Sequence, residues 1–167
     1  MTKDVPGNSD VAMTFKEKTV LFFASGCFSG YLPVAPGTFG TLVGLPLCFF
    51  LSKIDFFAAA IYITLFVIFA IWIAHMAENI LQKTDPGYIV VDEIAGIMIT
   101  FIGIPFTLFS AGAGFLVFRI MDIWKPFPIR RIEKKIPGGA GVVMDDLLAG
   151  VYANLLLRIV LLVKDAI

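Results

Sequence analysis

Charged residues are scarce in this chain of 167 residues. They make up only 16% of it, whereas a typical soluble domain contains about 25%. Hydrophobic residues make up 59%, against about 45–50% in soluble domains, which is more than one soluble core requires. The 13 basic and 13 acidic residues cancel, so the chain has no overall positive field that would attract nucleic acid. We therefore expect a one-domain membrane protein and exclude nucleic acid as a partner.

Cysteine and histidine are also rare. The two cysteines, Cys27 and Cys48, stand in apolar surroundings, which favours buried thiols over a disulfide framework or a metal cluster. The single histidine, His75, follows a long apolar run, and we expect it to be a hydrogen-bonded interior residue. We expect no secretory signal, because the first eighteen residues are polar and contain no apolar core.

Long uncharged runs predict an all-α fold. Residues Thr19–Ser52 carry no charge, but repeated proline and glycine indicate two helices joined by a loop rather than one span. Residues Phe56–Ala74 are also uncharged, and the apolar pattern continues to Leu81. This segment is long enough to cross a bilayer, so it predicts the one clear transmembrane helix.

A third uncharged run, Ile94–Phe118, contains the sequence Gly-Ile-Pro at residues 103–105. As one continuous helix it would hold Asp92 and Asp122 more than about 30 Å apart, on opposite faces of a membrane. A break at the Gly-Ile-Pro sequence instead creates two half-helices of about 9 and 13 residues, which enter and return. We therefore predict a helical hairpin with both ends on one side, covered at its turn by neighbouring helices.

The resulting fold class is an integral membrane helical bundle of about six helices, including short re-entrant helices. A polar segment at residues 1–18 precedes one membrane-embedded domain over residues 19–167. The last apolar segment, Leu147–Val163, contains Arg158, which is near enough to the end to reach the membrane interface. Polar loops are predicted at residues 33–38, 83–92 and 119–146.

The alternation of helices and turns places these three loops on the same side of the membrane. Most basic residues lie in them, whereas the opposite turns contain Lys53 alone. By the positive-inside rule that side is cytoplasmic. We therefore expect a multi-pass protein with one charged site facing the cytoplasm.

Acidic residues gather at the helix ends on this side. Neighbouring carboxylates cannot all ionise without compensation, and a hard divalent cation is the commonest compensator. Oxygen ligands are the only plentiful kind here, which favours Mg²⁺ over zinc. Acidic pairs also cap helix starts, and that simpler interpretation stays open for each pair taken alone. The candidate ligands are Asp92, Glu93, Asp122, Asp145 and Asp146.

A magnesium site points to a phosphate substrate, because Mg²⁺ usually binds few carboxylates together with phosphate oxygens. Arg119, Lys125 and Arg130 could bind phosphate, although Arg130 also fits an amphipathic stretch on anionic lipid. Two segments that contain glycine, Pro-Gly-Thr at residues 36–38 and Pro-Gly-Gly-Ala-Gly at residues 137–141, could bring backbone N–H groups close to an anion. Cysteine-, aspartyl- and histidine-dependent phosphatase motifs are absent. The best remaining nucleophile is a metal-activated water, with a carboxylate as general base.

Four segments resemble the phosphatidylglycerophosphatase A family. They occur in the family's order and spacing, and the resemblance extends from about Gly26 to the C-terminus. One small departure is Thr41, where the family has serine, and the hydroxyl is kept. The segments are residues 32–40 (LPVAPGTFG), 92–96 (DEIAG), 118–130 (FRIMDIWKPFPIR) and 138–150 (GGAGVVMDDLLAG).

The resemblance implies an Mg²⁺-dependent phosphatase of the bacterial inner membrane. It would hydrolyse phosphatidylglycerophosphate to phosphatidylglycerol and phosphate in phospholipid biosynthesis, with no obligate protein partner. The family's fold has one helix surrounded by others. By position, the implied catalytic residues are Asp92, Glu93, Asp122 and Asp146, which together with Asp145 would bind the metal. The implied phosphate ligands are Arg119, Lys125 and Thr38, and Arg130 joins them as a substrate-binding residue.

Two other functions stay open at this point. The same chemistry could act on another lipid phosphate, such as phosphatidic acid. A small membrane cation carrier is a different class, in which buried carboxylates line an ion path. A carrier should place its acidic residues in the middle of continuous helices, whereas here they stand at helix ends beside basic residues.

Overall fold

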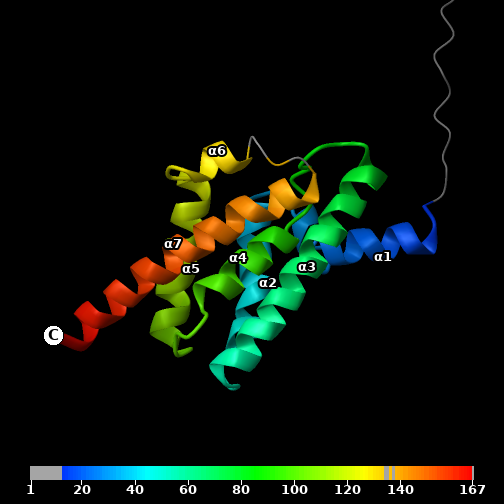
Figure 1. The fold of residues 1–167 in the computed structure, drawn as a ribbon. Coiled ribbons are helices and arrows are strands. Elements are labelled where there is room, and N and C mark those ends of the chain that lie inside the picture. Colours follow the sequence, from blue (N-terminus) through cyan, green and yellow to red (C-terminus); the bar gives the residue numbers. More distant parts are fainter. Residues whose placement is uncertain (1–12, 134–135, 137, 167) are drawn as a thin grey trace, which may run out of the picture.

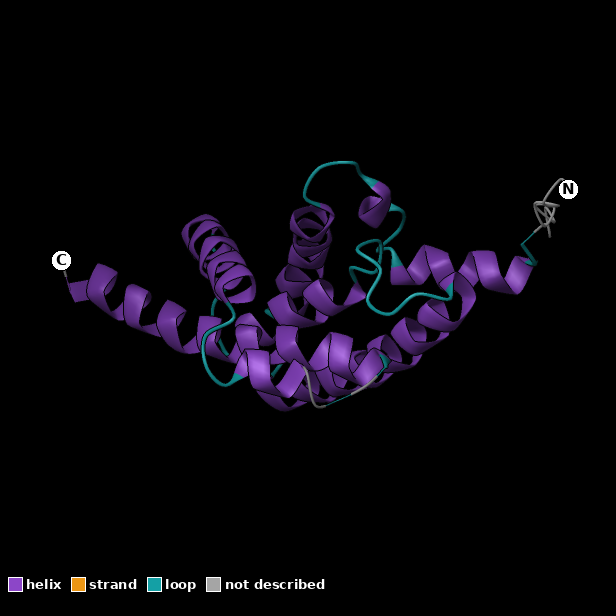
Figure 2. Cartoon of the chain, turned by 90° about the horizontal axis from the view of Figure 1, so that it is seen from above, coloured by secondary structure: helices purple, strands orange, loops and turns teal. Residues whose placement is uncertain are grey.

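The computed structural model describes residues 13–133, 136 and 138–166. Within these residues the protein is all-helical, with seven α-helices, one short 3₁₀-helix and no strand (Figures 1 and 2). The predicted fold class is therefore confirmed as all-α, with one helix more than expected. The elements are α1 (Phe15–Ala24), η1 (Ser29–Tyr31), α2 (Pro36–Leu51), α3 (Phe56–Leu81), α4 (Val91–Thr100), α5 (Leu108–Trp124), α6 (Ile129–Glu133) and α7 (Gly139–Ala166).

Helix α4 is the centre of the bundle. It packs against α2, α3, α5 and α7, and all but two of its ten residues are buried (Figure 1). Its apolar side chains join the main core with Phe118 of α5 and Leu157 of α7. The expectation of one helix surrounded by others is confirmed.

The predicted hairpin is present as α4 and α5. Helix α4 ends before Gly103, whose φ of +66° is the left-handed conformation that glycine adopts without strain. Thr107 then begins α5 by capping the backbone N–H of Ser110. The two outer ends meet, because Arg119 of α5 lies 3.8 Å from Glu93 in the first turn of α4. Both arms are longer than predicted, since the helices continue into the charged residues.

The predicted polar loop at 119–146 is wrong. Most of these residues are helical, in the end of α5, in α6 and in the start of α7. The glycines before Asp145 indicated a loop, but Gly139 begins α7 and faces the α3 backbone at Ile71 and His75, where a Cβ would clash. Asp145 and Asp146 thus lie about two turns inside α7, so they do not cap its N-terminus. The segment's glycine at 139 serves helix packing.

Three smaller expectations also need correction. Helix α1 begins at Phe15, inside the predicted polar segment 1–18, because Thr14 and Glu17 form a reciprocal cap. Residues 1–12 of that segment lie outside the described residues. Cys27 and His75 are exposed rather than buried, although Asn79 does hydrogen-bond the His75 ring at 3.2 Å.

Two helices are long and apolar enough to cross a membrane, namely α3 and α7. Helix α3 has the bounds that the apolar pattern predicts, Phe56–Leu81. Helix α7 is longer than the predicted Leu147–Val163, and it meets the same criterion of length and composition that the sequence prediction granted to α3 alone.

The contact between α4 and α7 leaves no room for a side chain at Gly96. A Cβ there would lie 2.6 Å from the Phe118 ring and 2.7 Å from the Asp146 carbonyl oxygen. At Gly112 of α5, in contrast, an added Cβ would have no atom within 4 Å. We expect Gly96→Ala to destabilise the protein by about 1–3 kcal/mol, which lowers the Tm in detergent by about 3–10 °C.

The matched control is Gly112→Ala, which should leave the Tm unchanged or raise it slightly, because alanine favours the helix. Thermal unfolding of both purified variants measures the difference. Equal Tm values for the two variants would contradict the tight α4–α7 contact.

Candidate active site

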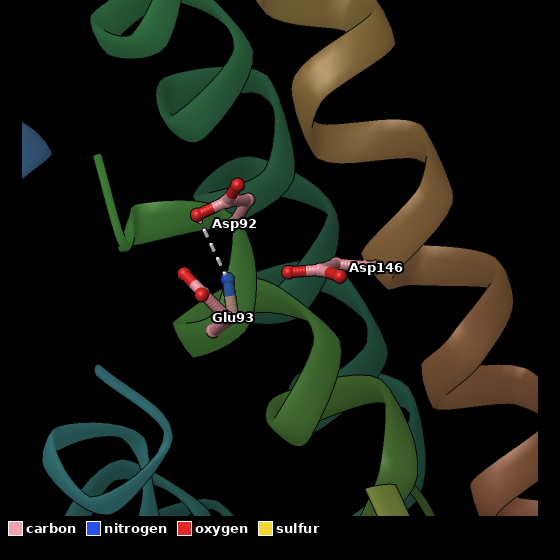
Figure 3. A group of neighbouring side chains, drawn as sticks. All are labelled: Asp92, Glu93 and Asp146. Carbon is pink, nitrogen blue, oxygen red and sulfur yellow. Dashed lines mark hydrogen bonds between the residues drawn. The ribbon is translucent and has the colours of Figure 1, made fainter. Parts of the chain in front are cut away.

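Three carboxylates converge where α4 begins beside α7. Asp92 and Glu93 stand in the first turn of α4, and Asp146 faces them from α7 (Figure 3). One oxygen from each carboxylate lies within 4.8 Å of the others. Asp92 and Asp146 are only 7% and 3% exposed. Three acidic groups therefore share one small buried volume.

The local fold explains this placement. The start of α4 is tied down by Val90, whose N–H donates to the Ala24 carbonyl at 2.9 Å. Within the first turn, the Asp92 carboxylate accepts a hydrogen bond of 3.1 Å from the Glu93 backbone N–H (Figure 3). An acidic residue is favourable here because unpaired N–H groups give a helix start a positive partial charge.

Burial and mutual repulsion disfavour the ionised forms of these carboxyl groups. Burial raises the pKa of the Asp92 carboxyl well above its ordinary value, and the nearby Glu93 charge raises it further. Burial is also the main cause of the raised pKa of Glu93. The Oε2 atom of Glu93 is buried and has no hydrogen-bond partner among the described residues. An unpaired buried acceptor in an all-oxygen cluster fits a hard divalent ion.

Two basic residues flank the carboxylates, and each is paired with an acidic residue. Arg119 contacts Asp122 one turn further along α5 and lies 3.8 Å from Glu93. Lys125, at the end of α5, donates to the Asp145 carboxylate. Three of the five predicted acidic ligands thus cluster together, and the other two, Asp122 and Asp145, pair with Arg119 and Lys125. Glu93 links the two sets through its contact with Arg119.

The first turn of α2 closes another side of the group. Gly37 lies directly against the Glu93 carboxylate and the Arg119 guanidinium, so that a Cβ would collide with both. The glycine at this position therefore allows close approach to site side chains. Thr38 is the next residue in this turn, and no side chain caps the helix start at Ala35. Pro36 has no N–H, and the Thr38 N–H donates to the Ala35 carbonyl at 2.9 Å. The residue of this turn that meets Glu93 and Arg119 is therefore Gly37.

Arg130 stands further out. Its guanidinium is exposed and donates to the Trp124 carbonyl at 3.1 Å. It lines a hollow of about 390 Å³ together with Lys125, Phe127 and Arg131. The contacts described for Arg130 do not reach the carboxylates, so only Lys125 links this hollow to them.

Sequence reasoning missed one feature, the polar contacts of Asn154 and Arg158. Arg158 is exposed, and it donates to Asn154 and to the Ile102 carbonyl. Its predicted position at the membrane interface stays a prediction. Asn154 in turn donates to carbonyls at the end of α4. A lone asparagine in an apolar helix was the available signal, because a buried amide requires partners.

Comparison with known proteins identifies the family. The family model "Phosphatidylglycerophosphatase A" matches residues 22–161. The chain is 34% identical to phosphatidylglycerophosphatase A of Escherichia coli strain K12 over 78% of this chain and 76% of the relative. It is 36% identical to the Haemophilus influenzae protein of the same name, over 78% and 81%.

A third relative, from Bacteroides thetaiotaomicron, is named "Putative phosphatidylinositol-3-phosphatase" and is 36% identical over 83% of this chain and 91% of its own. No solved structure gives a significant match. The family model covers most of the chain, and all four sequence segments that resemble the family lie within the matched residues. This chain therefore belongs to the phosphatidylglycerophosphatase A family.

Proposed function

We propose that this protein hydrolyses phosphatidylglycerophosphate to phosphatidylglycerol and phosphate, with Mg²⁺ bound by Asp92, Glu93 and Asp146. The observation that carries this proposal is the buried carboxylate cluster with the Arg119 guanidinium beside it. Water supplies the oxygen for the released phosphate, and the glycerol oxygen leaves with a proton. Family membership supports the lipid substrate.

The donor set favours Mg²⁺. All three clustered ligands are carboxylates, and Mg²⁺ prefers oxygen ligands and commonly shares them with substrate phosphate. When bound, Mg²⁺ would neutralise phosphate charge and lower the pKa of a water molecule. One carboxylate of the site, from Asp92, Glu93, Asp122 or Asp146, would accept the proton of the attacking water.

The remaining charged groups would bind and orient the substrate phosphate. Arg119 has a buried Nε without a hydrogen-bond partner among the described residues, so its fork can still engage an anion. Thr38, in the first turn of α2, would add its hydroxyl as a further donor. Asp122 and Asp145, predicted as further metal ligands, would hold Arg119 and Lys125 in place.

The hollow beside Lys125 and Arg130 would receive the rest of the headgroup. Its basic lining suits an anionic lipid, and exposed Phe127 and Trp124 suit the interface between headgroups and acyl chains. Arg130 would contact substrate here rather than at the reacting phosphorus.

We place the protein in the bacterial inner membrane as a multi-pass protein with its site facing the cytoplasm. Only 22% of the most apolar part of α3 is buried inside the protein, so its large apolar side chains cover the surface. Such a surface is stable against lipid and unfavourable in water. The basic residues at the site's end, among them Arg119, Lys125, Arg130 and Arg131, support the orientation.

A second candidate substrate is another phosphomonoester lipid. The name of the Bacteroides relative favours phosphatidylinositol 3-phosphate, and phosphatidic acid is the simplest alternative. The carboxylate cluster alone does not distinguish these phosphomonoesters. Rates for the three lipids, measured side by side in mixed micelles, should be highest for phosphatidylglycerophosphate. A higher rate for either alternative lipid would mean that this lipid is the substrate, and the proposed phosphatase chemistry would still hold.

Removing one clustered charge should abolish the reaction. We expect Asp92→Asn and Asp146→Asn each to lower kcat about a hundredfold or more, because each loses a ligand or base in the buried group. Phosphate release from the lipid measures the effect. The matched control is Asp165→Asn, an exposed carboxylate at the end of α7, which should keep full activity. Full activity of either site variant would refute the proposal.

Metal removal should be reversible. We expect chelation with EDTA to stop phosphate release, and excess Mg²⁺ to restore it more effectively than Zn²⁺, because the clustered donors are all oxygens. Wild-type protein in micelles is sufficient for this assay. Activity that persists after chelation would contradict the metal site. Cation flux into liposomes without phosphate release would indicate a carrier instead.

The geometry of Arg119 should matter as well as its charge. Arg119→Lys keeps the charge but loses the fork that contacts two carboxylates, so we expect kcat/KM to fall at least about tenfold. Lys53→Arg is the control, because Lys53 is exposed and follows the end of α2 that lies away from the carboxylates. Equal kinetics for both variants would show that Arg119 does not bind the phosphate.

A further inference from the structure

The broken end of α4 is held by a side chain of α7. Asn154 is 8% exposed, and its Nδ2 donates to the carbonyls of Thr100 at 2.8 Å and Ile102 at 3.0 Å. A longer contact of 3.4 Å reaches the Ile99 carbonyl. The last carbonyls of a helix have no partner within the helix, so buried ones need partners from elsewhere. Asn154 supplies them from a neighbouring helix.

Arg158 determines which way the Asn154 amide points. The Arg158 Nε donates to Asn154 Oδ1 at 2.9 Å, and another guanidinium nitrogen donates to the Ile102 carbonyl at 3.0 Å. Because the amide oxygen faces a donor, the amide NH₂ group faces the α4 carbonyls. The pair therefore forms one directed link from α7 to α4.

This link has the same spacing from the carboxylates on both helices. Thr100 follows Asp92 by eight residues, and Asn154 follows Asp146 by eight residues, which is about 12 Å along each helix. Between them, a Cβ on Gly96 would meet the Asp146 carbonyl, and the Thr100 hydroxyl lies 3.4 Å from the Gly150 carbonyl. The two helices thus run parallel and in register from the carboxylates to the link.

A shift in this register would dismantle the carboxylate group. Sliding α7 by one helical turn moves Asp146 by about 5.4 Å relative to α4. That displacement exceeds the 4.8 Å within which the three carboxylate oxygens lie. Close glycine contacts permit the helices to approach, but the amide is the directional contact at the far end.

We propose that Asn154, oriented by Arg158, is a positioning residue that keeps Asp146 in register with Asp92 and Glu93. The link acts from the opposite end of the α4–α7 contact, so it touches neither metal nor substrate. This inference rests on the proposed function only for its kinetic readout, because register itself is a property of the two helices.

A purely stabilising role makes a different prediction, and Ser110 provides the control. Ser110 is 1% exposed at the same hairpin turn, and its hydroxyl donates to the Pro105 carbonyl at 2.7 Å. The hydrogen bonds described for Ser110 stay within the turn and the start of α5. Loss of the Ser110 hydroxyl should destabilise the hairpin but should leave the contact between α7 and α4 intact.

The experiment compares Asn154→Leu with Ser110→Ala in the full chain. We expect both to lower the Tm, but only Asn154→Leu to weaken Mn²⁺ binding by about 10–100-fold, measured by electron paramagnetic resonance with Mn²⁺ as the probe. Asn154→Leu should also lower kcat for phosphatidylglycerophosphate with little change in KM. Arg158→Met, at an exposed position, should act in the same direction and serves if Asn154→Leu does not fold.

Amide hydrogen exchange separates this inference from the proposed function. In Asn154→Leu and Arg158→Met, exchange should increase along all of α4, including its first turn, whereas in Ser110→Ala the increase should stay near the start of α5. That pattern would support the register even if no lipid were hydrolysed and no Mn²⁺ bound, in which case only the proposed function fails. Two results would overturn the positioning role. One is equal exchange in α4 for the Asn154, Arg158 and Ser110 variants. The other is that the wild type binds Mn²⁺ and the Asn154 and Ser110 variants bind it with equal affinity.

Discussion

The close parallel contact between α4 and α7 underlies most of this structure. Gly96 and Gly150 let the two backbones approach until no side chain fits between them. Because the contact is so close, carboxylates carried by the two helices face each other away from water. The same contact creates an electrostatic problem, since like charges are brought together where solvent cannot screen them. The central position of α4 therefore concentrates charge in the core of an otherwise apolar bundle.

Charge compensation is arranged around that core in layers. The innermost group contains Asp92, Glu93 and Asp146, and a bound divalent ion would compensate the negative charge of these carboxylates. Around it, Lys125 contacts Asp145, and Arg119 contacts Asp122 and lies 3.8 Å from Glu93 of the inner group. Buried ion pairs hold their members in defined directions even where they add little to stability. The outer pairs thus hold positive charge beside the inner group.

Much of the fold could be read from the sequence, because apolar length and breaking residues determine it locally. The bounds of α3 and the hairpin break before Gly103 are examples. The start of α7 could not be predicted, since its glycines suggest a loop until α3 is known to pack against Gly139. The acidic residues were identifiable from the sequence, but their division was not. Asp145 and Asp146 point about 100° apart on a helix, and only the packing of α7 decides which one faces α4.

The hairpin has a consequence for how such a chain enters a membrane. Its turn, residues 101–107, carries no charge, whereas Glu93 and Arg119 flank the apolar arms at the other end. Inserting a charged side chain at the centre of a membrane helix costs about 2.5–3.5 kcal/mol. In the proposed orientation, only the uncharged turn and the apolar arms move into the bilayer during synthesis, and every charged residue of the hairpin remains on the side where it was made.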